Sequence, residues 1–137
     1  MKNNIWIALL LLLAMTSCLP DKIGKKDPEP ELAGTYQMTS YVFEGLTAKP
    51  LIVIPQSGAS GSVNVIKDSD TQISATLSTT INGKTASDDL GSANIRKSSG
   101  SSYDILNGNT RIGSIDGTTF SVTLSDNTGS LSISARK

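Results

Sequence analysis

The sequence of 137 residues contains no histidine and a single cysteine, Cys18. Histidine is the commonest general base near neutral pH and a frequent zinc ligand, and a thiol nucleophile requires a cysteine. A Ser-His-Asp triad is therefore excluded. With one cysteine the chain forms no internal disulfide, so a folded domain must depend on its core. The composition argues against an enzyme and gives no reason to expect a cofactor or a metal.

The sequence also lacks an excess of charge of either sign and a long apolar run. Lys and Arg number 12, and so do Asp and Glu. Without a basic excess, binding to nucleic acid has no electrostatic support. The apolar run Ile5–Ala14 has ten residues, whereas a membrane-spanning helix needs about 20.

The short apolar run instead fits a secretion signal. Lys2 precedes the run, and the small residues Thr16 and Ser17 follow it, directly before Cys18. A charged start, about 7–15 apolar residues and small residues at the cleavage site define a secretory signal. The arrangement resembles a bacterial lipoprotein signal peptide with its lipobox, with Met15 in the place usually taken by Leu. The resemblance implies that residues 1–17 are removed and that Cys18 is lipidated. The alternative is an ordinary secreted protein with a chance cysteine.

The residues after Cys18 bear on where such an anchor would hold the protein. Leu19 stands where many lipoproteins retained at the inner membrane have Asp, so the resemblance favours the outer membrane and leaves the leaflet open. Residues 18–33 are rich in proline and in charges of both signs. Such a segment is expected to be an extended tether, or alternatively to carry a signal for surface export.

Residues 34–137 have the pattern of β-structure. Apolar and hydroxyl side chains alternate in three segments, with Ile73, Ala75 and Leu77, then Phe120, Val122 and Leu124, then Leu131, Ile133 and Ala135 on the apolar faces. A period of two places one face inward and the other toward water. No segment after Leu32 has a helical apolar stripe.

Hairpin turns are expected between the alternating segments. Asn82-Gly83, Asn107-Gly108 and Asp116-Gly117 tolerate the positive φ that two-residue turns require. About eight strands are expected, over 34–43, 51–54 or 62–67 or both, 72–81, 90–96, 102–106, 109–115, 118–125 and 130–136. In the first strand, Tyr36 and Met38 are out of phase with Tyr41 and Phe43, which predicts a bulge or bend near Ser40. Gly113 marks a second expected bend.

The expected fold is all-β, an antiparallel meander of about eight strands closing into a small barrel that removes exposed edges. A two-sheet β-sandwich is the alternative. Gly34 and Tyr36, at the start of the first strand, resemble the Gly-x-Trp element of lipocalin-like domains, with Tyr in place of Trp. The order of lipobox, charged tether and β-meander is similar to that of small lipocalin-like lipoproteins of the Bacteroidetes.

The resemblance implies a small apolar ligand inside the barrel. The candidate lining residues are the large side chains Tyr36, Met38, Tyr103 and Phe120. An eight-stranded barrel is just wide enough to be packed solid or to hold one small ligand. The alternative function is therefore a non-catalytic structural or interaction module with a filled core. Leu51–Ile54 is expected to be a buried strand or a lid at the barrel entrance.

Carboxylates are the remaining candidates for chemistry. A pair of them could act on a glycosidic bond, and Asp68, Asp70, Asp88 and Asp89 could contribute to a calcium site. However, most aspartates fall in turn sequences, where Asp commonly accepts hydrogen bonds from its own backbone. Solvated turns are therefore the expected role.

Overall fold

The computed structural model describes residues 28–45 and 52–137, and these form strands and turns without a helix. The expected signal peptide 1–17, Cys18 and the start of the tether lie outside them. The described strands are, in chain order, β1 (Gly34–Gly45), β2 (Ile52–Ile54), β3 (Ala59–Ser69), β4 (Gln72–Ile81), β5 (Lys84–Lys97), β6 (Tyr103–Asn107), β7 (Thr110–Ile115), β8 (Thr119–Asp126) and β9 (Gly129–Arg136).

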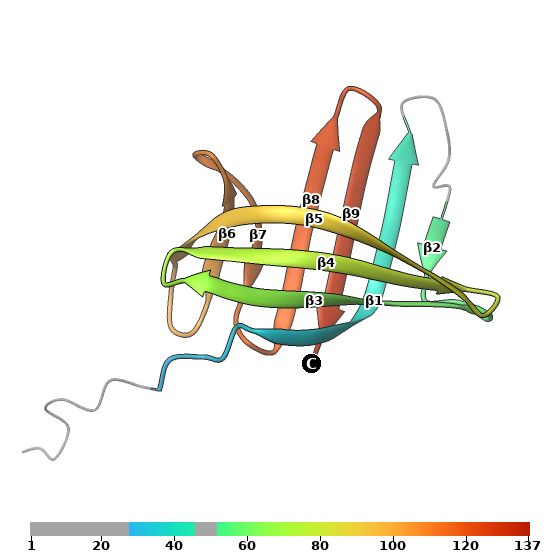
Figure 1. Ribbon diagram of the computed structural model, residues 1–137. Helices are drawn as coiled ribbons and strands as arrows, with labels where there is room; N and C mark the ends of the chain where they lie inside the picture. Colours follow the sequence, from blue (N-terminus) through green and yellow to red (C-terminus); the bar gives the residue numbers. More distant parts are fainter. Residues whose placement is uncertain (1–27, 46–51) are drawn as a thin grey trace, which may run out of the picture.

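The strands form a closed antiparallel barrel (Figure 1). From β3 to β9 each strand pairs with the next along the chain, and β1 pairs with both β3 and β9. Eight strands thus complete the barrel, and β2 pairs with the C-terminal half of β1 as an additional strand. This closure confirms the expected barrel and excludes the sandwich alternative.

The strand predictions hold in the C-terminal half and need correction in the middle. Both β2 and β3 exist, so the two alternatives for the second strand are both realised. Asn82 and Gly83 have positive φ and join β4 to β5 as expected. However, β5 begins at Lys84 rather than at residue 90. Residues 84–89 are exposed on both faces, and a strand without a buried face has no apolar alternation to reveal it.

A bulge in β1 explains the phase shift in its sequence. The pairing with β9 shifts between Met38 and Ser40, so that one extra residue of β1 is accommodated there. Beyond this point Tyr41 lies opposite Ile133, and Phe43 lies opposite Leu131. Because a bulge reverses the alternation of faces, Tyr41 and Phe43 point to the inside, as do Tyr36 and Met38 before the bulge.

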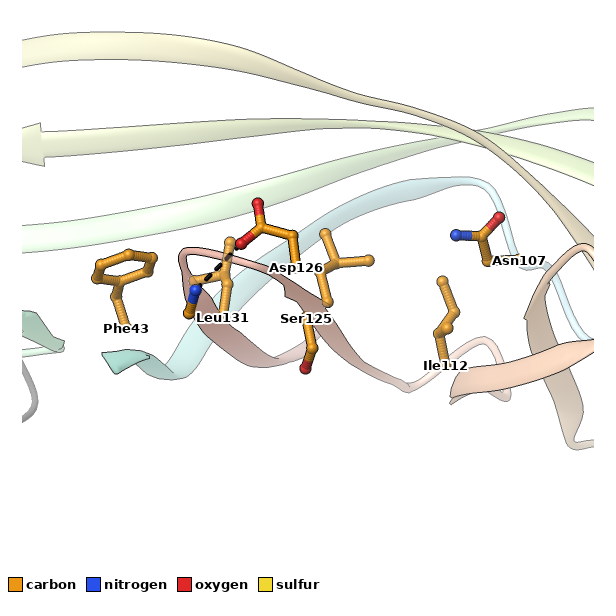
Figure 2. A pocket seen from close by; sticks show the side chains of 8 residues that line it. Phe43, Asn107, Ile112, Ser125, Asp126 and Leu131 are labelled. Atoms are coloured by element: carbon orange, nitrogen blue, oxygen red, sulfur yellow. Dashed lines mark hydrogen bonds between the residues drawn. The ribbon is translucent and has the colours of Figure 1, made fainter. Parts of the chain in front are cut away.

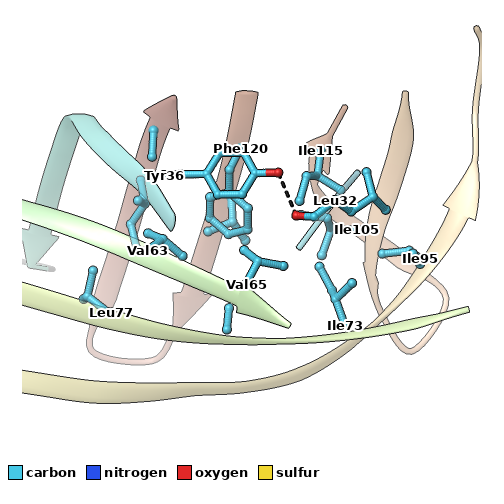
Figure 3. Close-up of a cluster of buried hydrophobic side chains, with 14 of the residues drawn as sticks. Leu32, Tyr36, Val63, Val65, Ile73, Leu77, Ile95, Ile105, Ile115 and Phe120 are labelled. Atoms are coloured by element: carbon cyan, nitrogen blue, oxygen red, sulfur yellow. Dashed lines mark hydrogen bonds between the residues drawn. The ribbon is translucent and has the colours of Figure 1, made fainter. Parts of the chain in front are cut away.

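The interior is packed along β1, β3, β4 and β8 (Figure 3). The rings of Tyr36 and Phe120 lie 6.0 Å apart at 47°, and Val63 and Val65 from β3 are buried beside them. A cluster of this kind is the main source of stability in a chain without disulfides.

The folded part begins before Gly34. The segment 28–33, which we call the strap, lies against the barrel, and Leu32 is only 2% exposed within the core. The Tyr36 hydroxyl donates a hydrogen bond to the Leu32 carbonyl oxygen at 2.7 Å, and the Tyr103 hydroxyl donates to the Glu29 carboxylate. Leu32, which was expected to belong to the tether, is therefore an apolar residue that the barrel buries.

Candidate functional site

The barrel wall divides between β7 and β8 at one end. These strands pair only from Gly113 to Ile115 on β7 and from Phe120 to Val122 on β8. Beyond this stretch β8 continues to Asp126, paired with β9, while the start of β7 stays paired with β6. We call the resulting opening the split.

A bulge and a glycine in β7 produce the split. The pairing of β7 with β6 shifts next to Ile112, and a bulge bends the strand that contains it. Gly113 lies directly opposite Val122, where an added Cβ would overlap the Ser121 carbonyl oxygen. Gly113 thus allows β7 to approach β8 closely at their last paired position, and the bulge then turns β7 away. From the sequence, Gly113 was expected only to mark a second bend, and neither the bulge at the neighbouring Ile112 nor the close approach to β8 was predicted.

An open cavity of about 350 Å³ lies at this end of the barrel (Figure 2). We call it the mouth cavity. It is lined by Phe43, Asn107, Ile112, Leu124, Ser125, Asp126, Gly129 and Leu131. Leu131 lies opposite both Phe43 on β1 and Leu124 on β8, so these three side chains form one apolar row across adjacent strands. The cavity therefore combines an apolar floor with exposed polar residues at its rim.

A second, smaller void lies deeper in the barrel. It has a volume of about 40 Å³ and shares Ile112 and Leu124 with the mouth cavity. Its other lining residues include Ile73, Ile105 and Phe120. The centre of the barrel is nearly filled, because the side chains of the core cluster are buried there, and the larger space for a ligand exists at the mouth.

The four side chains expected from sequence to line a ligand site are all inside the barrel. Tyr36, Met38, Tyr103 and Phe120 are buried. Phe120 lines the small deep void, whereas the mouth cavity is lined by other residues. Ligand contact by these four stays a prediction. Sequence reasoning favoured the largest side chains and missed that the strands extend beyond the packed centre, where Phe43, Leu124 and Leu131 face a hollow.

The segment 51–54 was expected to be a buried strand or a lid. Ile52–Ile54 is strand β2, paired with β1, and the Ile54 side chain is buried. Leu51 lies outside the described residues. Within the described part, the segment is therefore a strand of the sheet.

Two turn aspartates accept hydrogen bonds from their own turns, as expected. Asp116 accepts from the backbone N–H groups of Thr118 and Thr119. Burial raises the pKa of the Asp116 carboxyl, but these hydrogen bonds outweigh burial and lower the pKa below its ordinary value. Asp126, at the rim of the mouth cavity, accepts from the Thr128 hydroxyl and from the backbone of Thr128 and Gly129, which lowers its pKa. Both carboxylates thus stabilise turns.

The other candidate carboxylates are dispersed. Asp68 accepts a hydrogen bond from Ser74, and Asp70 pairs with Lys67 at 2.9 Å. Asp89 accepts a hydrogen bond from the Gly91 backbone at the bulge of β5. In residues 28–45 and 52–137, no three acidic, histidine or cysteine side chains come together as metal ligands would.

A charged cluster lies on the outer face beside the split. The Asp104 carboxylate on β6 accepts from Arg111 Nε at 2.8 Å and pairs with Arg96 Nη2 at 3.3 Å. The hydrogen bond from Arg111, together with the one from Arg96, lowers the pKa of Asp104. Two cations therefore share one anion, which leaves a net positive charge next to the opening.

Among the described residues, no helix is long and apolar enough to cross a membrane.

Comparisons with known proteins assign no family to this chain. Comparisons with protein-family models, with curated proteins and with solved structures give no match.

Proposed function

We propose that this protein is a non-catalytic lipoprotein, anchored to a bacterial outer membrane through Cys18, whose barrel binds a small apolar molecule in the mouth cavity. The observation that carries the ligand proposal is the apolar row of Phe43, Leu124 and Leu131 along an open cavity of about 350 Å³. Sites for small molecules are typically mostly apolar hollows of about 300–1,000 Å³ with a few polar groups. The mouth cavity fits the lower end of this range.

The anchor rests on the sequence before the barrel. The lipobox-like segment ends at Cys18, ten residues before the start of the strap at Pro28. One acyl chain holds a protein only weakly at a membrane, and several chains on one residue give stable attachment. We expect acyl mass on the mature protein by mass spectrometry, and its loss in Cys18→Ala. Acyl incorporation that persists in Cys18→Ala would contradict the anchor.

The ligand proposal is tested with a neutral apolar probe, N-phenyl-1-naphthylamine, whose fluorescence rises in apolar sites. We expect saturable binding to the full chain and a roughly fivefold weaker affinity in Leu131→Ser, because part of the apolar contact is lost. The matched control is Ile66→Ser, because Ile66 is 54% exposed on the outside of β3. Equal affinity in all three proteins would overturn binding at the mouth cavity.

A second candidate function is a structural or interaction module of the envelope. It is favoured by the nearly filled centre of the barrel, where the deep void measures only about 40 Å³. Absence of saturable probe binding to the unmodified chain would favour this function over the first.

A further inference from the structure

The mouth cavity has a neighbouring hollow at the split, on the outside of the barrel. A second hollow of about 480 Å³ is lined by Asn107, Thr110, Arg111, Ile112, Thr123 and Ser125. Asn107, Ile112 and Ser125 line both hollows. We call the second one the outer hollow. A single elongated molecule placed across the split would therefore touch both hollows at once.

The two hollows differ in chemistry. Apolar side chains of β1, β8 and β9 dominate the mouth cavity. The outer hollow is lined instead by two threonines, a serine, an asparagine amide and the Arg111 guanidinium, with Ile112 as its apolar member. Hydroxyl and amide groups donate and accept hydrogen bonds, and guanidinium only donates. The pair of hollows thus suits a molecule with an apolar part and a polar part.

The charge beside the outer hollow is positive. Arg111 and Arg96 share the single Asp104 carboxylate. The contact of Arg111 with Asp104 uses Nε, which is one of five N–H donors on the guanidinium. The Arg111 side chain is 60% exposed, whereas that of Asp104 is 14% exposed. The cation is therefore more accessible than the anion that holds it.

The acidic residue among those that line the two hollows lies on the mouth side. Asp126 lines the mouth cavity and not the outer hollow, and its carboxylate accepts hydrogen bonds from Thr128 and Gly129. An anionic group is therefore favoured in the outer hollow beside Arg111 and disfavoured in the mouth cavity beside Asp126. Arg111 and Asp126 thus set a direction for a bound amphiphile, because the Asp104 carboxylate is shared by two arginines and is only 14% exposed.

We propose that the ligand is an anionic amphiphile, with its apolar part in the mouth cavity and its anionic group in the outer hollow beside Arg111. The proposal rests on the proposed function, because it assigns a ligand class to the same cavity. Charge-assisted hydrogen bonds from a guanidinium to a carboxylate, sulfate or phosphate are among the stronger polar contacts in proteins. The split lets one molecule reach both environments.

The test compares two ligands of equal chain length, decanoate and decanol, by displacement of N-phenyl-1-naphthylamine from the full chain carrying Cys18→Ser. We expect decanoate to bind more tightly than decanol. Arg111→Gln should weaken decanoate about tenfold, which corresponds to the loss of a charge-assisted hydrogen bond, and leave decanol unchanged. Arg96→Gln is the matched control, because it removes the same charge from the same Asp104 partner but does not line the outer hollow.

The contrary outcomes separate the two proposals. If decanol and decanoate bind equally and Arg111→Gln changes neither, the anionic amphiphile is overturned while apolar binding stands. If Arg111→Gln and Arg96→Gln weaken decanoate to the same extent, long-range charge accounts for the preference and the contact with Arg111 is overturned. If neither compound displaces the probe and the probe itself does not bind, both proposals fail.

Discussion

Tyr36 connects the strap to the barrel. Its side chain is fully buried, its ring packs on Phe120, and its hydroxyl donates to the Leu32 carbonyl oxygen. The Lys137 ammonium lies 5.1 Å from the ring centroid, within the range of a cation–π contact. The same lysine donates hydrogen bonds to the carbonyl oxygens of Glu31 and Ala33. One aromatic residue thus joins the core, the strap and the C-terminus.

Tyr36→Phe should destabilise the protein by roughly 1 kcal/mol at pH 7, because a buried hydrogen bond is lost. Burial, followed by the carboxylates of Asp116 and Glu31, raises the pKa of Tyr36 to about 12. The unfolded chain releases this proton near pH 10. The stabilisation from neutral Tyr36 is therefore complete below pH 10 and lost as pH rises to 12. In urea unfolding, the difference in free energy of unfolding between wild type and Tyr36→Phe should narrow over that range and then change sign, because the loss of about 1.4 kcal/mol per pKa unit exceeds the initial difference. A gap that stays constant would contradict this account.

Strand β7 shows how a local irregularity creates the candidate site. At Gly113 the two strands β7 and β8 are still paired and lie close together. The bulge at the neighbouring Ile112 then turns β7 away from β8. An element that paired with β8 along its whole length would close the split, and the two hollows would no longer meet. The irregular strand is thus the structural reason for the opening.

Gly113→Ala should destabilise the barrel by about 1–3 kcal/mol, the usual cost of forcing an extra methyl group into a packed site. The added Cβ would overlap the Ser121 carbonyl oxygen and lie 2.9 Å from Val122 Cα, so backbone must move. Gly45→Ala is the matched control, since the nearest atom to its Cβ would be 4.0 Å away. We expect that control to stay within about 0.5 kcal/mol of wild type in urea unfolding. Equal stability of the two variants would show that β7 tolerates displacement from β8.

At the scale of elements, sequence predicted what depends on local alternation. The segments around Ile73, Phe120 and Ile133 were recognised because each has one buried face. Residues 84–89 were missed because both faces are exposed. The position of the mouth cavity was missed for another reason. It depends on which strands extend past their neighbours, and that is set by pairing between residues distant in sequence, such as Phe43 with Leu131.

For the whole molecule, the strap and the mouth cavity lie at opposite ends of β8. The strap passes the turn before β8, where a Cβ on Gly117 would lie 3.1 Å from the Glu31 carbonyl oxygen. The turn after β8, from Asp126 to Gly129, borders the mouth cavity. Eight residues of strand separate the two turns by about 25 Å. The chain from Cys18 therefore joins the barrel at the end away from the proposed ligand site.

Because Leu32 is part of the core cluster, the strap and the barrel should unfold together. Leu32→Ala is expected to lower the free energy of unfolding by about 2–5 kcal/mol, the range for removing a buried leucine side chain. Ile66→Ala removes a side chain that is 54% exposed and should cost far less, since surface substitutions usually stay within about 0.5 kcal/mol. Urea unfolding followed by far-ultraviolet circular dichroism should give one transition in each protein. If Leu32→Ala matches Ile66→Ala in stability, the strap is not part of the folded unit, and the domain begins at Gly34.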